Sequence, residues 1–491
     1  MRLPGLLLAL LLALPGGTAA AATPADVAAR RAELMRQIGP DGMLILLAPP
    51  PKNRNGDVDW PFRQDDNLVY LTGLENAGTA LVLVPGEASH REIAFSADSD
   101  PAQELWNGRV PTFDEVSARS GIREVASNTR FREFLRAAME GRAWGTSQAY
   151  RSFATAGLPN WQRAVHSGKA VVWMVLEDRA FGGPATAEQA LLEELRRSYP
   201  ELQVRDAFPL LTGMRMVKDP NEVATVQRAI DVTVEAQKAA MRRVGSARHE
   251  YEVQATIEYT FRNLGACCWG FPSIVASGRN ATTLHYEANN DPIPAGGLML
   301  TDIGAEVDGY TADVTRTYPQ NGRFSPEQRA IYEAVLRAQT ETMALMKPGA
   351  RMGEVHEEAI RLLGEDLHKL GLVSRNEREQ VRMYFPHGLG HQLGLRVHDV
   401  VDRSRPLEPG MIVTNEPGLY VRPADVRANP VYLALPANER AGIDAALTRY
   451  ADIGVRIEDD VLVTAGAPRN LSAAAPRTVA DVEAWMQGGT P

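Results

Sequence analysis

Five side chains in the C-terminal half of the chain can bind metal ions, and their chemistry restricts the fold. Each lies in a segment with the pattern of a β-strand or a strand end: Asp302, Asp313, His391, Glu416 and Glu458. Four carboxylates and one imidazole form a hard, oxygen-rich ligand set, which suits a pair of divalent ions such as Mn²⁺ better than a thiolate-bound structural zinc. Two ions that share a bridging water are typical of hydrolases. We therefore expect these distant strands to meet at one centre.

Length and composition describe a globular chain with more than one domain. The 491 residues are enough for two or three domains with sizeable cores. The hydrophobic content of 44% and the charged content of 23% are ordinary for such proteins. The net charge is -9 and no long basic run occurs, so we expect no nucleic-acid partner.

The N-terminus has the pattern of a secretory signal peptide over residues 1–22. Arg2 precedes an apolar run from Leu3 to Leu14, and small residues follow up to Ala22. The run is too short to span about 30 Å of hydrocarbon, which favours cleavage over a transmembrane anchor. No cysteine lies near the cleavage region, which argues against a lipid anchor. We expect a secreted or periplasmic protein without membrane contact after signal cleavage.

The two cysteines of the chain, Cys267 and Cys268, are neighbours in the sequence. Neighbouring cysteines rarely form a disulfide, because the geometry is strained. No other soft ligand lies nearby, so we do not expect these cysteines to bind a metal. The pattern predicts two buried thiols and a fold that holds without disulfides.

Apolar runs and helical patterns divide the mature chain into two domains and a tail. Residues 24–210 alternate buried strands with helices, which predicts an α/β domain with a mainly parallel sheet. Residues 211–470 change to antiparallel strands with Gly-rich turns, which predicts an α+β domain. Residues 471–491 are a C-terminal tail without a predicted structure. In the first domain the expected elements include strands at 43–48, 80–84 and 170–175 and helices at 25–37 and 187–197.

The domain boundary falls at 206–219, just before a strong helix start. Asp219 is the expected N-cap, Pro220 occupies the first helical position and Glu222 the third, which completes a capping box. Beyond the boundary, long helices are predicted over 220–243, 249–264, 326–346 and 352–370.

The segment 298–318 predicts a β-hairpin around the two-residue turn Asp308-Gly309. In that register Asp302 pairs with Thr315, and Asp313 lies two positions away on the same face. Diagonal neighbours on one face have Cβ atoms about 7 Å apart, so both side chains can reach a pair of ions about 3.5–4 Å apart. The alternative is two solvated side chains on an exposed sheet face.

Three of the nine histidines fall within twelve positions, at His387, His391 and His398. A helix would place the first two on one face, but Pro386 and the nearby glycines argue against a helix. We interpret the segment as a Gly-rich turn that enters a strand and leaves room for a ligand. Neutral imidazole suits both metal binding and proton transfer, although one of the three can be a structural histidine.

The last two carboxylates of the ligand set stand near strand ends. Glu416 follows the predicted strand 411–415, where a carboxylate is costly to bury unless it is paired or bound to a metal. Glu458 lies in the predicted strand 454–463, where Arg456 shares its face and can hold a metal-binding carboxylate. Taken singly, each glutamate is as simply explained by a surface salt bridge.

Five segments of the C-terminal half resemble the metallopeptidase family of aminopeptidase P and prolidase: HYEANN, TDIGAEVDGYTADVTRTYP, HGLGHQLGLRVHD, TNEPGLY and GVRIEDD. Two N-terminal segments, 62–73 (FRQDDNLVYLTG) and 104–109, resemble the N-terminal domain of aminopeptidase P. The likeness covers most of the mature chain, from about residue 30 to about residue 465. It implies a creatinase-like N-terminal domain followed by a pita-bread catalytic domain.

The resemblance also implies the metal and the roles of the site residues. It implies that Asp313 and Glu458 bridge two Mn²⁺ ions per subunit, that Asp302 binds one ion, and that His391 and Glu416 bind the other. Co²⁺ or Zn²⁺ would fit the same ligands. The residues with an expected catalytic role beside the ions are His285, His387, His398, Glu416 and Arg456.

The activity that the resemblance implies is that of a Xaa-Pro aminopeptidase, which hydrolyses the peptide bond before a proline in the second position. The family likeness also leads us to expect a homo-oligomer, either a dimer or a tetramer. Residues 422–452 look like an inserted loop and helix that would cover the cleft, which leaves a Xaa-Pro dipeptidase (prolidase) as the alternative. A non-catalytic pita-bread binding module is disfavoured, because all five metal ligands are present.

A proline ring requires an apolar pocket, to which Tyr286 or Trp106 can contribute. In relatives with this N-terminal domain, the tryptophan can come from a neighbouring subunit. The alternative for Trp106 is a buried core aromatic.

Overall fold

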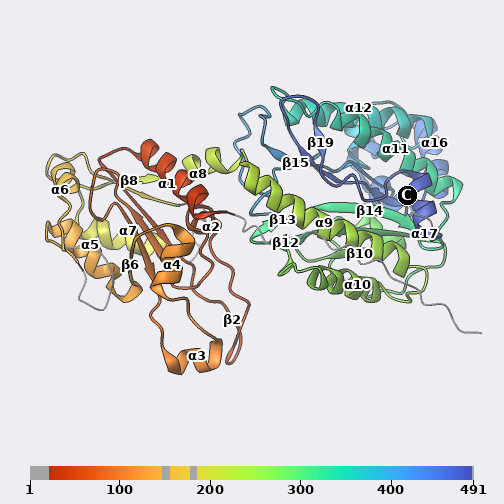
Figure 1. The fold of residues 1–491 in the computed structure, drawn as a ribbon. Helices are drawn as coiled ribbons and strands as arrows, with labels where there is room; N and C mark the ends of the chain where they lie inside the picture. Colours follow the sequence, from red (N-terminus) through yellow and green to blue (C-terminus); the bar gives the residue numbers. More distant parts are fainter. Residues whose placement is uncertain (1–21, 146–154, 177–184, 489–491) are drawn as a thin grey trace, which may run out of the picture.

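The computed structural model describes residues 22–145, 155–176 and 185–488, and the predicted signal peptide lies almost wholly outside these ranges. The chain forms an N-terminal domain and a larger C-terminal domain (Figure 1). Helix α9 (Pro220–Arg243) starts where the two domains meet and runs along the C-terminal domain. This architecture, α/β followed by α+β, confirms the predicted fold class.

A mixed sheet forms the centre of the N-terminal domain, and its described strands follow the order β6-β5-β4-β1-β7-β8. β4 is antiparallel to both β1 and β5, while the other pairs are parallel, so among the described strands only β4 opposes the common direction. The prediction of a mainly parallel sheet is confirmed with that exception. The bounds are Gly42–Leu47 (β1), Ala80–Leu83 (β4), Glu92–Ser96 (β5), Glu124–Ser127 (β6), Val171–Met174 (β7) and Gln203–Asp206 (β8).

Helices cover both faces of this sheet. Leu44 and Leu46 of β1 pack in one apolar cluster with α1, α2 and α4, whereas Met43 and Ile45 pack in another with α5, α6 and α7. The alternation follows from the two-residue period of a strand, and burial on both faces explains why these strands read as continuous apolar runs. The helices are Pro24–Ile38 (α1), Asp66–Thr72 (α2), Phe113–Ser120 (α4), Asn128–Arg130 (η1), Phe131–Glu140 (α5), Pro159–His166 (α6), Ala187–Ser198 (α7) and Phe208–Arg215 (α8).

A small hairpin, β2 (Asn53–Asn55) and β3 (Val58–Asp59), and helix α3 (Pro101–Asn107) extend away from this domain (Figure 1). On α3, the side chain of Trp106 is 83% exposed. The alternative that Trp106 is a buried core aromatic is therefore wrong.

The predicted helix start at the domain boundary is confirmed. Asp219 caps α9 and Pro220 lies in the first turn of the helix. The backbone N–H of Asp219 donates to the Glu222 carboxylate at 3.0 Å. Helix α10 (Glu250–Asn263) follows and packs against α9.

Antiparallel strands form the C-terminal domain, as predicted. The sheets have the orders β10-β11-β14, β13-β12-β9 and β15-β18-β19, and β16 pairs with β17. The bounds are Cys268–Trp269 (β9), Ile274–Ser277 (β10), Gly278–Thr282 (η2), Leu298–Ile303 (β11), Ala305–Val307 (β12), Tyr310–Thr311 (β13), Val314–Pro319 (β14), Ile412–Asn415 (β15), Gly418–Tyr420 (β16), Gly454–Arg456 (β17), Asp459–Leu462 (β18) and Arg469–Asn470 (β19).

The two cysteines lie at the edge of one of these sheets. β9 is a two-residue strand paired with β12 at the end of its sheet, and both Cys267 and Cys268 are exposed. The prediction of two buried thiols is wrong, because both cysteines lie at the open edge of this sheet although α10 packs against β9.

The insertion predicted at 422–452 contains three described helices where the sequence predicts a loop and one helix: α14 (Pro423–Ala428), α15 (Pro430–Leu433) and α16 (Ala437–Arg449). Ile443 of α16 is buried in an apolar cluster with α11 (Pro326–Met343) and α12 (Met352–Lys369). The insertion thus packs on the helical layer, to which the short α13 (Arg378–Val381) also belongs. Its expected role as a cover of the cleft stays a prediction.

The C-terminal tail, for which the sequence predicts no structure, folds onto the C-terminal domain. It follows directly after β19, which pairs with β18, and its helix α17 (Val479–Met486) packs on α9. The indole N–H of Trp485 donates to the Lys238 carbonyl at 3.0 Å, and the Arg242 guanidinium lies 3.9 Å from the centroid of that ring.

Buried ion pairs join the two domains. Arg215, at the end of α8, donates to Asp399 at 2.6 Å, and the Lys218 ammonium donates to the same carboxylate at 3.3 Å. Buried charges are tolerated only when they are paired. These contacts therefore fix the segment after His391 against the N-terminal domain.

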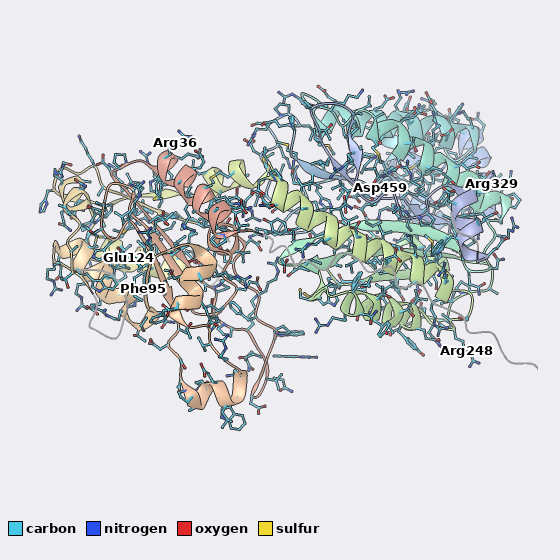
Figure 2. The ribbon with its side chains drawn as sticks, in the orientation of Figure 1. Arg36, Phe95, Glu124, Arg248, Arg329 and Asp459 are labelled. Carbon is cyan, nitrogen blue, oxygen red and sulfur yellow. The ribbon has the colours of Figure 1, made fainter. Side chains whose placement is uncertain are left out.

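Charged side chains such as Arg36, Arg248 and Arg329 lie on the outside of the molecule, whereas Asp459 lies inside the C-terminal domain (Figure 2). Within the described ranges, no helix combines the length and the apolarity that crossing a bilayer requires.

Candidate metal centre

The predicted hairpin is confirmed and holds two carboxylates inside the domain. Asp302 of β11 pairs with Thr315 of β14 in the expected register. Asp308 and Gly309 both have positive φ angles, 49° and 79°, as a two-residue type I′ turn requires. Asp302 is 8% exposed and Asp313 is 5% exposed, so the alternative of a solvated sheet face is wrong.

Asp313 stands between β13 and β14 with one carboxylate oxygen unpaired. Its backbone N–H donates to Asp460 at 3.1 Å. Its Oδ1 has no hydrogen-bond partner within the described residues. Burial, together with the nearby carboxylates of Asp302 and Asp460, raises the pKa of Asp313 well above its usual value.

Glu458 occupies a break between two strands. The sequence predicts one strand over 454–463, but β17 ends at Arg456 and β18 begins at Asp459, because β17 pairs with β16 while β18 pairs with β15. The Thr315 hydroxyl donates to Glu458 Oε2 at 2.7 Å, whereas Oε1 finds no partner in the part of the chain that is described. Burial and the neighbouring Asp313 raise the pKa of Glu458 well above its usual value.

His391 faces these carboxylates from a loop. The expected strand after the Gly-rich turn is wrong, since the segment makes only an isolated bridge between Gln392 and Val413 among the described residues. Gly390 lies against the Thr414 carbonyl, where any Cβ atom would clash. His391 Nδ1 donates to the Gln392 carbonyl at 3.0 Å, which leaves Nε2 as the lone-pair nitrogen of the neutral ring.

The nitrogen lone pair of His391 points at carboxylate oxygens. Nε2 lies 3.4 Å from Asp313 Oδ2 and 3.6 Å from Glu416 Oε1. The ligand atoms of Asp313, His391 and Glu458 all lie within 4.8 Å of one another. A lone pair and several anionic oxygens repel each other in a buried site unless a cation lies between them. The donor set of this chain therefore fits divalent metal ions.

Asp302 completes the set, with Arg456 as its support. Asp302 Oδ1 is buried without a partner among the described residues, and Oδ2 accepts from the Arg456 guanidinium at 2.5 Å. Arg456 thus holds the carboxylate of Asp302, one of the expected metal ligands. A fixed guanidinium orients that carboxylate.

A hydrogen-bonded chain extends from Arg456 to His387. Arg456 donates to the Tyr420 hydroxyl at 2.8 Å, and this hydroxyl lies 2.9 Å from His387 Nε2. His387 Nδ1 donates to the Gly388 carbonyl at 2.8 Å, so Nε2 accepts the tyrosine proton. Burial and the charge of Arg456 lower the pKa of His387 to about 3, which keeps its imidazole neutral.

His398 and His285 lie on the open side of the centre. The ring centroids of His398 and His391 are 4.1 Å apart, and the side chains of His398 and His285 are exposed. Partial burial, then His391 and His285, lower the pKa of His398 to about 4. The structure thus brings all four predicted site histidines to the centre, since His387 Nδ1 lies 3.6 Å from Glu416 Oε2 while its Nε2 accepts from Tyr420.

Four residues of the site region escape the sequence analysis: Thr315, Tyr420, Asp460 and Glu250. Thr315 and Asp460 each lie two residues after a predicted ligand, and Tyr420 lies four residues after Glu416, all three in strands next to those ligands. Such residues can be found by examining the strand positions near each predicted ligand, because alternate residues of a strand share a face. Glu250, at the start of α10, has no such signal.

Glu250 organises the loop that carries His285. Its carboxylate is fully buried and accepts from the Ser277 backbone N–H at 2.7 Å, the Tyr286 hydroxyl at 2.8 Å and the Asp291 backbone N–H at 3.0 Å. Tyr286, expected in a proline pocket, therefore has its hydroxyl held by Glu250.

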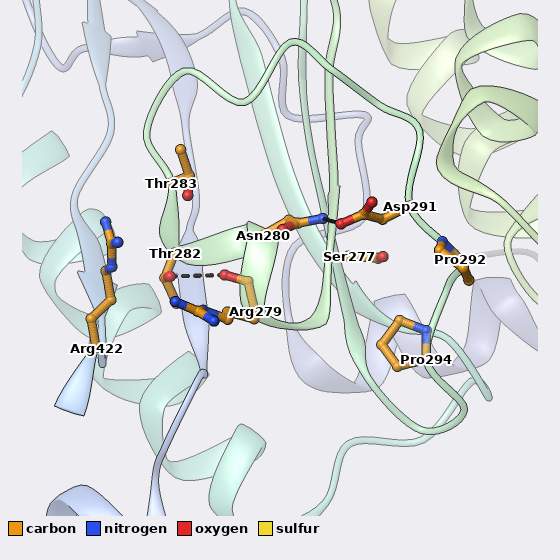
Figure 3. Close-up of a pocket in the computed structure, with 9 residues that line it drawn as sticks. All are labelled: Ser277, Arg279, Asn280, Thr282, Thr283, Asp291, Pro292, Pro294 and Arg422. Atoms are coloured by element: carbon orange, nitrogen blue, oxygen red, sulfur yellow. Dashed lines mark hydrogen bonds between the residues drawn. The ribbon is translucent and has the colours of Figure 1, made fainter. Parts of the chain in front are cut away.

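A hollow of about 510 Å³ lies beside the same loop, with Arg422 on one side and Asp291 on the other (Figure 3). Its other lining residues are polar or proline: Ser277, Arg279, Asn280, Thr282, Thr283, Pro292 and Pro294.

Known proteins share both domains of this chain. Residues 224–465 match metallopeptidase family M24, and residues 27–145 match the N-terminal domain of aminopeptidase P. The Xaa-Pro aminopeptidase of Haemophilus influenzae is 34% identical over 93% of this chain and 96% of its own length. Human Xaa-Pro aminopeptidase 3 is 32% identical over 96% of this chain and 87% of its own length.

Solved structures agree with this relationship. The aminopeptidase PepP of Pseudomonas aeruginosa superimposes with a TM-score of 0.79 at 32% identity and covers 95% of this chain and 98% of its own. Aminopeptidase P of Escherichia coli, solved with the inhibitor Pro-Leu, superimposes with a TM-score of 0.78 at 29% identity over 95% and 99% of the two chains. With the ligand set and both domains in place, the chain belongs to the aminopeptidase P family of metalloaminopeptidases.

Proposed function

We propose that this chain is an exported Xaa-Pro aminopeptidase that works with two Mn²⁺ ions, for which Co²⁺ or Zn²⁺ can substitute at the same ligands. The observation that carries the proposal is the set of buried carboxylate oxygens without partners among the described residues, on Asp302, Asp313 and Glu458, with that of Asp460 beside them. Unpaired buried carboxylates are costly unless cations neutralise them. The specificity for proline rests on the names of the relatives.

The ligand set would hold two ions. Asp313 and Glu458 lie at the centre of the set and would be shared by both ions, while Asp302 would bind one and His391 with Glu416 the other. The distances of 3.4 Å and 3.6 Å from His391 Nε2 to Asp313 and Glu416 support the grouping of these three around one ion.

The two ions, when bound, supply activation of a water molecule and polarisation of the peptide carbonyl before proline. Glu416 takes a proton from that water and passes it to the proline nitrogen as the peptide bond breaks. Burial raises the pKa of the Glu416 carboxyl, which suits a group that both accepts and releases a proton. His387, held neutral behind Tyr420, keeps the Arg456 side of the site fixed.

His285 and His398 donate hydrogen bonds to the carbonyl oxygen as negative charge develops on it. Both lie on the open side of the centre, where a peptide enters. A neutral imidazole still carries one N–H donor, so the low pKa of His398 does not remove this role.

A product assay tests the function. The purified, Mn²⁺-loaded protein is offered a Xaa-Pro dipeptide and a longer Xaa-Pro-Xaa-Xaa peptide. We expect release of the first residue from the longer peptide, and two metal ions per chain by elemental analysis. Cleavage of the dipeptide alone would replace the proposal by a prolidase covered by residues 422–452. Cleavage of neither peptide by metal-loaded protein would refute it.

We also propose a homo-oligomer, a dimer or a tetramer. Leu105 and Trp106 are 82% and 83% exposed on α3, and two large apolar side chains side by side favour a covering partner. Light scattering on the eluting protein measures the mass. A monomer at working concentration would refute this part of the proposal.

Export is proposed from the pattern of residues 1–22 alone. Cell fractionation and N-terminal sequencing test it, with a mature chain that starts near Thr23 as the expected result. An intact Met1 on cytoplasmic protein would contradict export without touching the enzymatic proposal.

A further inference from the structure

A second group of metal-binding side chains lies outside the metal centre, at Cys267, Cys268 and Glu306. One ligand atom from each of the three lies within 4.8 Å of the other two. The group contains two sulfur atoms, whereas the metal centre offers only oxygen and imidazole nitrogen. The two groups therefore suit different classes of cation.

Backbone pairing holds the three residues together. Cys268 of β9 stands opposite Glu306 of β12, and the Cys267 backbone N–H donates to the Glu306 carbonyl at 3.1 Å. The Cys267 thiol donates to Glu306 Oε1 at 3.7 Å. The ladder thus fixes the distance between the sulfurs and the carboxylate before any ligand binds.

The Glu306 carboxylate divides its two oxygens between two neighbours. Its side chain is only 10% exposed, and Oε2 accepts from the Arg63 guanidinium of the N-terminal domain at 3.3 Å. Oε1 faces the Cys267 thiol, which is a weak hydrogen-bond donor. One oxygen is thereby oriented by an arginine while the other points at sulfur, an arrangement that supports a metal-binding carboxylate.

The two thiols differ in how readily they ionise. The neighbouring Cys267 side chain and the positive charges of Arg63 and Arg262 lower the pKa of Cys268, whereas Cys268, partial burial and the charge of Glu306 raise the pKa of Cys267. Cys268 is therefore the thiol that gives up its proton first. Arg262 also donates to the Cys267 carbonyl. Because both thiols are exposed, a cation reaches them from solvent.

We propose that Cys267, Cys268 and Glu306 form a peripheral site for a borderline-soft divalent cation of the Zn²⁺ class. Two sulfurs and one carboxylate oxygen supply three of the four tetrahedral positions, and water takes the fourth. Each thiol that binds releases its proton to solvent. The site lies where β12 meets Arg63, so a bound cation ties the edge of the catalytic domain to the N-terminal domain.

A titration with Cd²⁺ tests the site, because a thiolate bound to Cd²⁺ gives an ultraviolet charge-transfer band. The protein is reduced and its metal centre is filled with Mn²⁺ beforehand. Cd²⁺ that enters the metal centre is silent, since no sulfur lies among its ligands. We expect the band to saturate at one equivalent, and prior loading with Zn²⁺ to raise the Cd²⁺ concentration that half-saturates it, because both cations compete for the same thiolates. No band, or a titration that prior Zn²⁺ leaves unchanged, would overturn the proposal.

Matched variants assign the ligands. The double variant Cys267→Ser/Cys268→Ser is expected to lose the band and to keep its peptidase activity. Glu306→Gln is expected to keep the band with an affinity weaker on the order of tenfold. Arg63→Gln removes the same ion pair without removing a ligand, so its affinity is expected to match or exceed that of the unaltered protein. Equal weakening in Glu306→Gln and Arg63→Gln would overturn the role of the carboxylate.

A measurement on the unaltered protein tests the site even if the variants fail to fold. Zn²⁺ is expected to protect both thiols of the unaltered protein from a thiol reagent, while Mg²⁺ at the same concentration leaves them reactive. Equal reactivity with and without Zn²⁺ would overturn the site.

Discussion

Glu458 and Asp459 are neighbours in the sequence and both are buried, yet their surroundings are opposite. Asp459 accepts hydrogen bonds from Arg316, Gln339, Asn470, Ser472 and Arg477. Glu458 accepts one from Thr315 and keeps an oxygen without a partner among the described residues. Although burial raises the pKa of both, Arg316 and Arg477 bring that of Asp459 below its usual value, whereas Asp313 raises that of Glu458 further.

The difference separates a structural carboxylate from one that binds a ligand. A buried charge with a full set of donors stabilises the fold in which those donors are placed. A buried charge that faces other carboxylates destabilises the protein until a cation neutralises it. The unpaired oxygens, rather than burial or acidity alone, identify the metal centre.

Substitution at Glu458 is expected to have the largest effect on activity. Glu458→Gln removes a carboxylate that we propose both ions share, and should lower kcat/KM by about 10³-fold or more, because several kcal/mol of transition-state stabilisation are lost with the ions. The metal-free variant should be at least as stable as the metal-free unaltered protein, since one repelling charge is gone. Peptide hydrolysis and thermal unfolding measure the two effects, and near-normal activity would contradict the assignment of Glu458.

Substitution of the adjacent Asp459 should have the opposite result, with a large loss of stability and little loss of activity. Asp459→Asn leaves Arg316 buried without its charged partner and should lower the free energy of unfolding by about 3–5 kcal/mol. The fraction that remains folded should keep most of its activity per bound metal. Denaturant unfolding with active-site titration separates the two quantities. An Asp459→Asn protein as stable as its parent would break the comparison.

The support of Asp302 should show an intermediate effect. Arg456→Lys keeps the positive charge but loses the second hydrogen bond of the guanidinium, which joins Asp302 and Tyr420. We expect metal affinity to fall about 10–100-fold, as for other residues that orient metal ligands. Titration with Mn²⁺ provides the measurement, and Arg329→Lys on the surface is the control.

In the metal-free protein, a fall in pH should have opposite effects on the stability that comes from Glu458 and on the stability that comes from Asp459. The folded-state pKa values of Asp313 and Glu458 are raised, so the folded protein binds more protons than the unfolded chain above about pH 4.5. As the pH falls towards that value, the free energy of unfolding should rise by about 1.4 kcal/mol per pH unit for each extra proton. Asp459, whose pKa is lowered, gives stability that is lost only below about pH 4.

Urea unfolding of metal-free protein across this pH range measures the effect. Saturation with Mn²⁺ should reverse the slope, because the ligands must be deprotonated to bind. The same pH trend with and without metal would contradict the proposed ligand set.

Substitution of Glu250 is expected to have the smallest effect. Like Asp459, Glu250 is buried and hydrogen-bonded, but its partners do not include an arginine. Glu250→Gln replaces an acceptor oxygen by an NH₂ group that faces the donors of Ser277 or Asp291. We expect a loss of about 1–2 kcal/mol in the free energy of unfolding. A drop in kcat with little change in metal affinity would show that the loop with His285 has shifted. Thermal unfolding, Mn²⁺ titration and steady-state kinetics provide the three measurements.

Local patterns in the sequence predict much of the fold. The strand runs of the N-terminal domain, the capping box at Asp219 and the turn at Asp308-Gly309 are set by neighbours in the chain, and the structure confirms each of them. The approach of Asp302 to Asp313 follows from the hairpin register alone. The family likeness then relates these residues to His391, Glu416 and Glu458.

Contacts between distant segments escaped prediction. The break before Glu458 arises because two successive strands pair with different partners, which no periodicity records. The fold of the tail depends on Trp485 reaching Lys238, and the exposure of Cys267 depends on which strand ends a sheet. The link between Tyr420 and His387 likewise joins residues on separate segments.

The pairing of Arg316 with Asp459 has a consequence for the order of events during synthesis. The two residues are separated by 143 positions, and Ser472 and Arg477, which also bind Asp459, follow later still. A chain made from its N-terminus folds its first domain early, because that domain needs no contact from beyond it to form its sheet. The hairpin of Asp302 and Asp313 then leaves the ribosome long before its partners exist. The surroundings of the metal centre can therefore be completed only after Arg477 has been made, close to the end of synthesis.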